Sequence, residues 1–177
     1  MKGKNIMKDI HEIYKEAGRL HGHYCPGLAS GVRAGIFAAD YLGTDPQTNK
    51  NLFCIYEKPA CYVDGIQWTF NTTAGKGNLI YYPAGKAAFS FYDAESGKSL
   101  RLSLKKIGDG MNRDELIEYI LTGPAEEIFS AGKTNLPCPV QKPRIPYGIC
   151  ECCGEETEKD KLVEKNGRKL CMDCAKL

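Results

Sequence analysis

Three side chains of metal-binding type stand close together near the start of the sequence: His21, His23 and Cys25. Imidazole nitrogen and thiolate sulfur are the ligands that zinc and other borderline-soft metals prefer. In an extended segment, a spacing of two residues places the three side chains on one face. The group therefore indicates a transition-metal site or, through its cysteine, an activated sulfur nucleophile. The alternative is a capped helix start with two solvated histidines.

Two cysteines precede predicted helices. Pro26 suits the first position of a helix, which would place Cys25 at the helix N-terminus, where the dipole and free N–H groups favour a thiolate. Cys61 follows Lys58-Pro59 at a second predicted helix start, so we expect a lowered pKa for this thiol too. Asp64 follows at helical spacing. The alternative is that Cys61 is a small buried residue and Asp64 a partner of the helix dipole.

These observations predict one core site organised around Cys25. Gly22 gives the chain the freedom to turn both imidazoles inward, and Cys61 can face the same crevice. Whether the site is catalytic is left open by the sequence. The candidate ligands of a core transition metal are His21, His23, Cys25 and Cys61. The candidate catalytic residues are His23, Cys25, Cys61 and Asp64.

A polar, glycine-containing loop over residues 71–79 is a candidate site for an anionic group of a substrate. Backbone N–H groups and a lysine of such a loop can hold an anion. The candidate residues are Asn71, Lys76 and Asn78. The spacing is not that of a Walker A loop. The alternative is a plain connection between a helix and a strand.

Two Cys-x2-Cys pairs near the C-terminus are separated by 17 residues and consist of Cys150, Cys153, Cys171 and Cys174. This is the spacing of a four-cysteine zinc site, and a hairpin around Asn166-Gly167 gives the order of a treble-clef finger. Four thiolates leave no open coordination position, so the zinc is expected to be structural. So small a segment cannot fold without the metal. A disulfide is the alternative, and Cys152 could replace Cys153 only by breaking the spacing.

The elements that position these residues are mixed helices and strands. The apolar periodicity predicts helices over 7–20, 26–42, 60–70, 112–122 and 125–131, and strands over 52–57, 79–82, 87–93 and 99–104. Glycine-containing turns between the last three strands predict an antiparallel meander. The fold class is therefore α+β, with a core of helices and antiparallel sheet followed by a small treble-clef zinc-finger domain.

Composition bounds the class of protein. The 177 residues are 42% hydrophobic with a net charge of +2, which suits one sizeable core and a small appendage. We expect a core domain over 1–135, a proline-rich linker over 136–146 and the finger over 147–177. The chain shows no basic run, no apolar stretch of the ~18–20 residues that span a membrane and no signal-peptide pattern. We therefore expect a cytoplasmic protein whose nine cysteines are ligands or reduced thiols.

Several motifs resemble the FmdE family, which takes its name from formylmethanofuran dehydrogenase. The matching segments are residues 21–29, 31–35, 61–67, 75–79 and 85–89, and the resemblance covers most of residues 7–135. It implies an α+β core that is often dimeric, a C-terminal treble-clef finger in some members, and a functional pocket bordered by the histidine–cysteine motif and Cys61. One departure is Asn71-Thr72, where the family usually has Gly-Cys. If that thiol is a ligand or redox partner, its chemistry is altered or lost here.

The resemblance implies a metal-binding protein of anaerobic one-carbon or redox metabolism, related to methanogenesis, with structural zinc in the finger and a candidate second transition metal in the core. The chain has no cysteine run of the iron–sulfur type, so we do not expect the catalytic subunit. The alternative is an accessory, metal-delivery or regulatory protein whose finger docks a partner. We expect a homodimer, favoured by the small residues of 26–42, a larger redox-enzyme partner and a small-molecule ligand, but no nucleic acid or membrane.

Overall fold

The computed structural model describes residues 9–140 and 145–176. The contacts within the chain divide it into two compact units that meet between residues 141 and 142. This boundary falls among the four prolines of 136–146, and the finer domain bounds at 135 and 147 stay a prediction. None of the helices within the described residues combines the length and the apolarity needed to cross a membrane.

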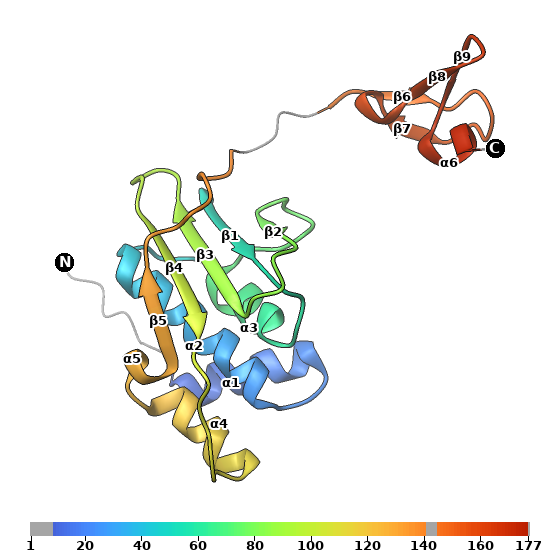
Figure 1. Cartoon of the computed structure of the whole chain (residues 1–177). Helices are drawn as coiled ribbons and strands as arrows, with labels where there is room; N and C mark the ends of the chain where they lie inside the picture. Colours follow the sequence, from blue (N-terminus) through green and yellow to red (C-terminus); the bar gives the residue numbers. More distant parts are fainter. Residues whose placement is uncertain (1–8, 141–144, 177) are drawn as a thin grey trace. The chain divides into compact units, whose positions relative to one another are not determined.

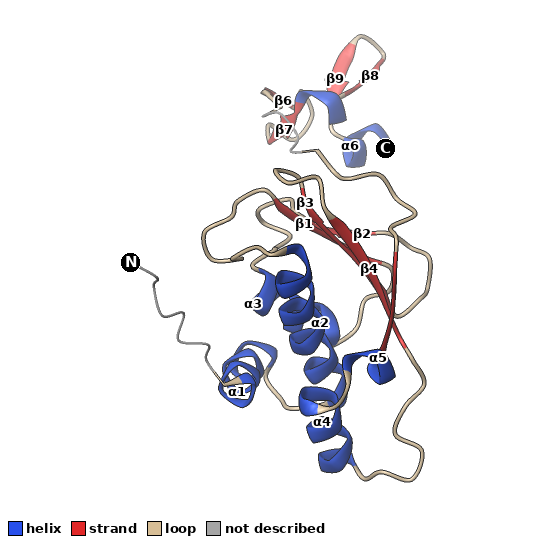
Figure 2. Ribbon diagram, turned by 90° about the vertical axis from the view of Figure 1, so that its left-hand side faces the viewer, coloured by secondary structure: helices blue, strands red, loops and turns tan. Residues whose placement is uncertain are grey.

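The N-terminal unit is a two-layer domain in which helices cover one face of a five-stranded sheet (Figures 1 and 2). Its elements are α1 (Ile10–His21), α2 (Pro26–Leu42), β1 (Leu52–Tyr56), α3 (Tyr62–Phe70), β2 (Leu79–Tyr81), β3 (Ala88–Asp93), β4 (Ser99–Leu104), α4 (Arg113–Thr122), α5 (Ala125–Ile128) and β5 (Phe129–Gly132). The strand order is β2-β1-β3-β4-β5. The predicted mixture of helices and sheet is confirmed.

Alternation along the central strand separates the two faces of the sheet. Phe89 and Phe91 of β3 belong to the main hydrophobic core, which lies between the sheet and the helices. Tyr92 packs in a different cluster on the opposite face. The main core therefore uses only one face of the sheet, and the other face is left for the segment that follows β5 and for solvent.

The predicted meander is wrong in one pairing. β2 does not pair with β3; it lies parallel to β1, with Cys54 opposite Leu79. β3 occupies the other side of β1 in antiparallel register. The reason is α3, because a strand–helix–strand crossover returns the chain in its original direction and so makes a parallel pair. β3 and β4 do form the expected antiparallel hairpin, with Ser90 opposite Arg101.

The predicted helix over 125–131 is too long. The helix ends at Ile128, and the following residues form β5 against β4, with Phe129 opposite Leu104. The Phe129 side chain is buried in the main core. Burial of this ring and pairing with β4 therefore decide the structure of a segment whose helical signal is short.

α2 and α3 pack closely because glycines remove the side chains between them. A Cβ on Gly31 would lie 2.0 Å from the carbonyl oxygen of Tyr62, and a Cβ on Gly35 would lie 1.9 Å from Thr69 Oγ1. These contacts advance in the same direction along both helices, so the helices run parallel with their N-termini at the same end. The small residues that favoured a homodimer are thus used within the chain. The edge strand β2 remains as the argument for a dimer.

Replacement of Gly31 by alanine should destabilise the protein, because the added Cβ would meet the backbone of α3. Overpacking of this kind costs ~1–3 kcal/mol of unfolding free energy, measured as a lower midpoint of urea unfolding. Gly75→Ala is the matched control, since nothing lies within 4 Å of its Cβ position. Its midpoint should stay the same or rise slightly. Equal midpoints for the two variants would contradict the close packing.

The C-terminal unit holds two small antiparallel hairpins and a short helix. Its elements are β6 (Tyr147–Ile149), β7 (Glu156–Glu158), the 3-10 helix η1 (Lys159–Lys161), β8 (Val163–Lys165), β9 (Arg168–Leu170) and α6 (Met172–Lys176). The turn between β8 and β9 has φ values of 53° at Asn166 and 73° at Gly167, which are the two positive values of a type I′ turn. The sequence predicted this hairpin.

Candidate metal sites

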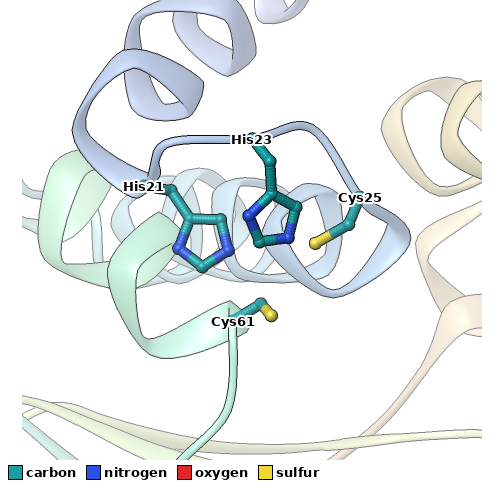
Figure 3. A group of neighbouring side chains, drawn as sticks. All are labelled: His21, His23, Cys25 and Cys61. Atoms are coloured by element: carbon teal, nitrogen blue, oxygen red, sulfur yellow. The ribbon is translucent and has the colours of Figure 1, made fainter.

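The candidate ligands of the core form a cluster of side chains at one end of α2 and α3 (Figure 3). His21 is the last residue of α1, while Cys25 and Cys61 are the N-caps of α2 and α3. His23 lies in the connection between α1 and α2. One potential ligand atom from each of these four residues lies within 4.8 Å of the other three. The structure therefore brings all four candidate ligands together.

The local geometry differs from the extended segment that the spacing predicted. His21 still belongs to the helix, and Gly22 ends α1 in the left-handed conformation with a φ of 85°. The chain then turns, so that the imidazole rings of His21 and His23 have centroids 4.2 Å apart. A helix end followed by a glycine turn, rather than strand alternation, therefore converges the two rings. The expected role of Gly22 agrees with this conformation.

Cys25 is held at the start of a 17-residue helix. Pro26 occupies the first turn as predicted, and the Leu28 N–H donates a hydrogen bond of 3.3 Å to Cys25 Sγ. The Tyr14 hydroxyl of α1 donates to the Cys25 carbonyl at 3.2 Å. The sequence spacing puts Tyr14 on the apolar side of α1, and no sequence signal indicates this second role. The sulfur thus faces a free helix N-terminus from a fixed backbone.

Cys61 does not have the lowered pKa that its position at a helix start predicted. Burial raises the pKa of this thiol, and the neighbouring sulfur of Cys25 raises it further. The two side chains approach over Gly27, where an added Cβ would lie 3.1 Å from the Cys61 Cβ. The like charge of two adjacent thiolates opposes the helix dipole. A bound cation would remove this repulsion.

Asp64 orients a histidine of the cluster. The His21 Nδ1–H donates to Asp64 Oδ2 at 2.7 Å, from a side chain that is only 10% exposed. His21 Nε2 is buried and makes no hydrogen bond to any described residue. An imidazole that donates from one nitrogen to a carboxylate and offers the other to a cation is the usual arrangement of a metal-binding histidine. The residues present therefore fit a metal ion, with Asp64 behind a ligand rather than in contact with the ion.

The candidate anion-binding residues lie away from this cluster. Asn71 caps the C-terminal end of α3, and a nine-residue helix separates it from Cys61 by ~13 Å. Lys76 Nζ is bound to Asn71 Oδ1 at 2.6 Å, and the Asn78 amide donates to the Leu52 carbonyl at 2.9 Å. Their polar groups thus hold the loop itself together. The missing family thiol at Asn71-Thr72 is likewise not a neighbour of the core cluster within this chain.

No large cavity opens onto the core cluster in the described part of the chain. A cavity of about 620 Å³ lies beside α1, α2 and α3, lined among others by Leu20, Gln67 and Trp68. Its lining includes none of the four clustered residues. A cavity of about 300 Å³ contains Asn71, Lys76 and Asn78. The cluster instead reaches solvent through the exposed His23.

The finger cysteines form the second cluster, again with ligand atoms within 4.8 Å of one another, and consist of Cys150, Cys153, Cys171 and Cys174. The Cys171 N–H donates to Cys150 Sγ at 3.2 Å. Backbone N–H groups of this kind lower the pKa of Cys150 to about 6, whereas the neighbouring thiols raise the pKa of Cys174. Four sulfurs so close together require a cation for all to ionise. The nine cysteines, all within the described residues, are free, so the disulfide alternative is not realised.

Comparison with known proteins places the chain in a family. The family model described as FmdE, molybdenum formylmethanofuran dehydrogenase operon, matches residues 20–130. A small α+β protein with a histidine–cysteine cluster is thus the class of the core. Because the match covers more than half of the chain, the protein belongs to the FmdE family. The model of the prokaryotic dksA/traR C4-type zinc finger matches residues 145–176, so the chain also carries a zinc finger.

Two individual proteins are similar. The crystal structure of an FmdE-like protein of the tungsten formylmethanofuran dehydrogenase type, from Syntrophus aciditrophicus, has a TM-score of 0.67 at 23% identity, covering 99% of this chain and 97% of that chain. This likeness shows the fold. A probable S-adenosyl-L-methionine-binding protein from Archaeoglobus fulgidus is 29% identical over 102 residues, which are 55% of this chain and 28% of that protein. The matched part therefore spans under a third of that relative.

Cys171→Ser should remove one zinc ion per chain, because three thiolates remain where four close the site. Elemental analysis of the dialysed protein measures the loss. Cys152→Ser is the matched control, since Cys152 is exposed and stands outside the four-cysteine cluster. It should keep the full zinc content. Loss of zinc from Cys152→Ser but not from Cys171→Ser would show that the ligand set is assigned wrongly.

Proposed function

We propose that the core binds one transition-metal ion through His21, His23, Cys25 and Cys61, and that the protein is an accessory metal-binding protein of anaerobic one-carbon or redox metabolism. The observation that carries this proposal is the state of His21. One ring nitrogen is bound to Asp64, while the other is buried without a partner among the described residues and belongs to the cluster. A buried, unsatisfied nitrogen costs ~1–3 kcal/mol unless a ligand occupies it.

The donor set favours zinc, iron or copper over hard cations. Two imidazoles and two thiols suit borderline and soft ions, whereas magnesium and calcium prefer oxygen. A bound ion would tie the ends of three helices together and, if it were redox-active, would add electron transfer. Four protein ligands leave no open coordination position, which favours holding or delivering the ion over catalysis. His23, exposed in the turn between α1 and α2, is the ligand best placed to exchange with a partner protein.

The metabolic assignment is supported by the family. The matching model is described by the molybdenum formylmethanofuran dehydrogenase operon, and the similar Syntrophus protein is described by the tungsten enzyme. We infer that this chain serves a redox enzyme of that type in the cytoplasm, where thiols stay reduced. The zinc finger would dock that larger enzyme. A second copy of the chain would pair through the edge of β2.

Metal analysis of variants tests the core site. Cys25→Ser should lower the metal content from two ions per chain to one, with the finger zinc retained. Asp64→Asn keeps all four ligands but weakens the support of His21, so the affinity for the core metal should fall ~10–100-fold. Cys138→Ser is the control, because this exposed thiol belongs to neither cluster. Competition with a chelator and the absorption of the cobalt-substituted protein measure both effects.

The outcomes separate the alternatives. Two metal ions in the Cys25→Ser protein would contradict the core site. An unchanged affinity of Asp64→Asn would leave the ligands in place but contradict the role of the carboxylate. A fall in affinity for Cys138→Ser equal to that of Cys25→Ser would indicate a general loss of folding rather than loss of a ligand.

A second function is favoured by one contact, the hydrogen bond between the side chains of Cys25 and Cys61. Thiols at this separation can form a disulfide, in which two thiols lose two electrons and two protons to an oxidant such as a second disulfide. Metal-free protein treated with oxidised glutathione should then lose about two mass units and two alkylatable thiols in a peptide pair containing Cys25 and Cys61. Formation of only mixed disulfides with glutathione would argue against a dithiol function.

A further inference from the structure

The face of the sheet opposite the helices carries a constellation separate from both metal clusters. This face is turned to the viewer in Figure 1, where the segment after β5 passes in front of the sheet. A cavity of about 300 Å³ opens there. The side chains that line it come from the sheet, from the β2–β3 connection and from the segment after β5, and the polar ones are Glu57, Tyr82, Lys86, Ser90, Arg101 and Asn135.

A buried ion pair forms the wall of this cavity. The Glu57 side chain is 7% exposed and that of Arg101 is 20% exposed. Arg101 donates from Nε and from Nη2 to the same oxygen, Glu57 Oε1, and both distances are 2.8 Å. Neither contact therefore uses Oε2 of Glu57 or Nη1 of Arg101. A buried pair is a weak source of stability, so a pair with unused hydrogen-bonding groups beside a cavity points to recognition.

Ser90 adds a polar group that the fold does not satisfy. It lies opposite Arg101 in the register of β3 and β4 and is 1% exposed. Its hydroxyl is near that of Tyr92 but makes no hydrogen bond of normal geometry with any described residue. Buried polar groups are nearly always hydrogen-bonded, so a hydroxyl left in the wall of a cavity indicates a partner that the protein alone does not provide.

The walls of the cavity are fixed by backbone hydrogen bonds. The Glu57 N–H donates to the Ala88 carbonyl at 3.0 Å, and the Gly85 N–H donates to the Glu57 carbonyl at 2.8 Å. Across the face, the Tyr92 hydroxyl donates to the Leu136 carbonyl at 2.9 Å. A site whose walls are already ordered loses little entropy when a ligand binds. The Gly85-Lys86 motif, which the core site does not use, thus lies at the mouth of this cavity.

We propose that this cavity binds a small α-amino acid, with the ligand carboxylate on Arg101 and Lys86 and the ligand ammonium on Glu57 Oε2. The charges decide this class. Two cationic side chains and one carboxylate match a zwitterion, whereas a phosphate dianion would meet the Glu57 carboxylate. A simple carboxylate would leave Oε2 unmatched. The volume lies at the small end of ligand pockets, which suits a molecule of this size.

Amide chemical shifts of the full-length, zinc-loaded protein test the proposal. Each of the twenty common amino acids is titrated, and alanine is compared with propionate, ethylamine and inorganic phosphate. At least one amino acid should shift the amides around Ser90, Arg101 and Asn135 and saturate. Propionate lacks the ammonium and ethylamine lacks the carboxylate, so each should bind ~10-fold or more weakly than the matching amino acid.

Two exposed lysines provide matched variants. Lys86→Gln removes a cation of the cavity and should weaken binding ~10-fold without affecting folding, because the side chain is at the surface. Lys58→Gln removes an exposed cation that does not line the cavity and should leave binding unchanged. The proposal is overturned if no amino acid gives saturating shifts at tens of millimolar, or if propionate or phosphate binds as tightly as the best amino acid.

Discussion

The contact between α2 and α3 is the constraint on which the rest of the core depends. Glycine at positions 31, 35 and 65 allows two backbones to approach to distances that any side chain would prevent. The helices run parallel, so their N-terminal ends meet, and the residue that caps each of them is a cysteine. The pair of sulfurs is thus a consequence of helix packing. A looser or antiparallel pair would separate Cys25 from Cys61.

The histidines depend on a different element. α1 ends at His21, and the Gly22 turn leads directly into α2, so the short connection brings both imidazoles to the same helix ends. Arg113 of α4 donates to the Tyr24 carbonyl, and this contact holds the connection against the helical layer. Three helices therefore supply or support one cluster. Such a cluster is ordered by the same contacts that build the hydrophobic layer, which gives a metal ion a largely prepared site.

The two clusters differ in what surrounds them. The four finger cysteines belong to a unit with few large buried side chains, of which Leu170 is one. Metal binding and folding are therefore coupled there. The core cluster belongs to a domain whose sheet and helices bury a continuous set of aromatic and aliphatic residues without it. Loss of a core metal should for this reason leave the domain folded, and the ion can serve a purpose other than stability.

The sequence by itself determined the features that depend on neighbouring residues. Examples are the start of α2 at Pro26, the capping box of Asn112 and Glu115 in α4, the type I′ turn at Asn166-Gly167 and the spacing of the finger cysteines. Each needs only a few consecutive residues with a known preference. The grouping of the two histidines with a cysteine was visible for the same reason, although the geometry that unites them is a helix end rather than a strand.

Only the tertiary structure decided which distant residues meet. His21 and Asp64 are 43 positions apart, and Arg101 and Glu57 are 44 apart, so no local pattern joins them. The parallel pairing of β2 with β1 follows from where α3 packs, which sequence periodicity does not reveal. The same packing separates Asn71 from Cys61 by the length of α3, although both belong to one motif-rich segment. Burial of the helical layer against one face of the sheet selects these partners, because that arrangement removes the most apolar surface from water.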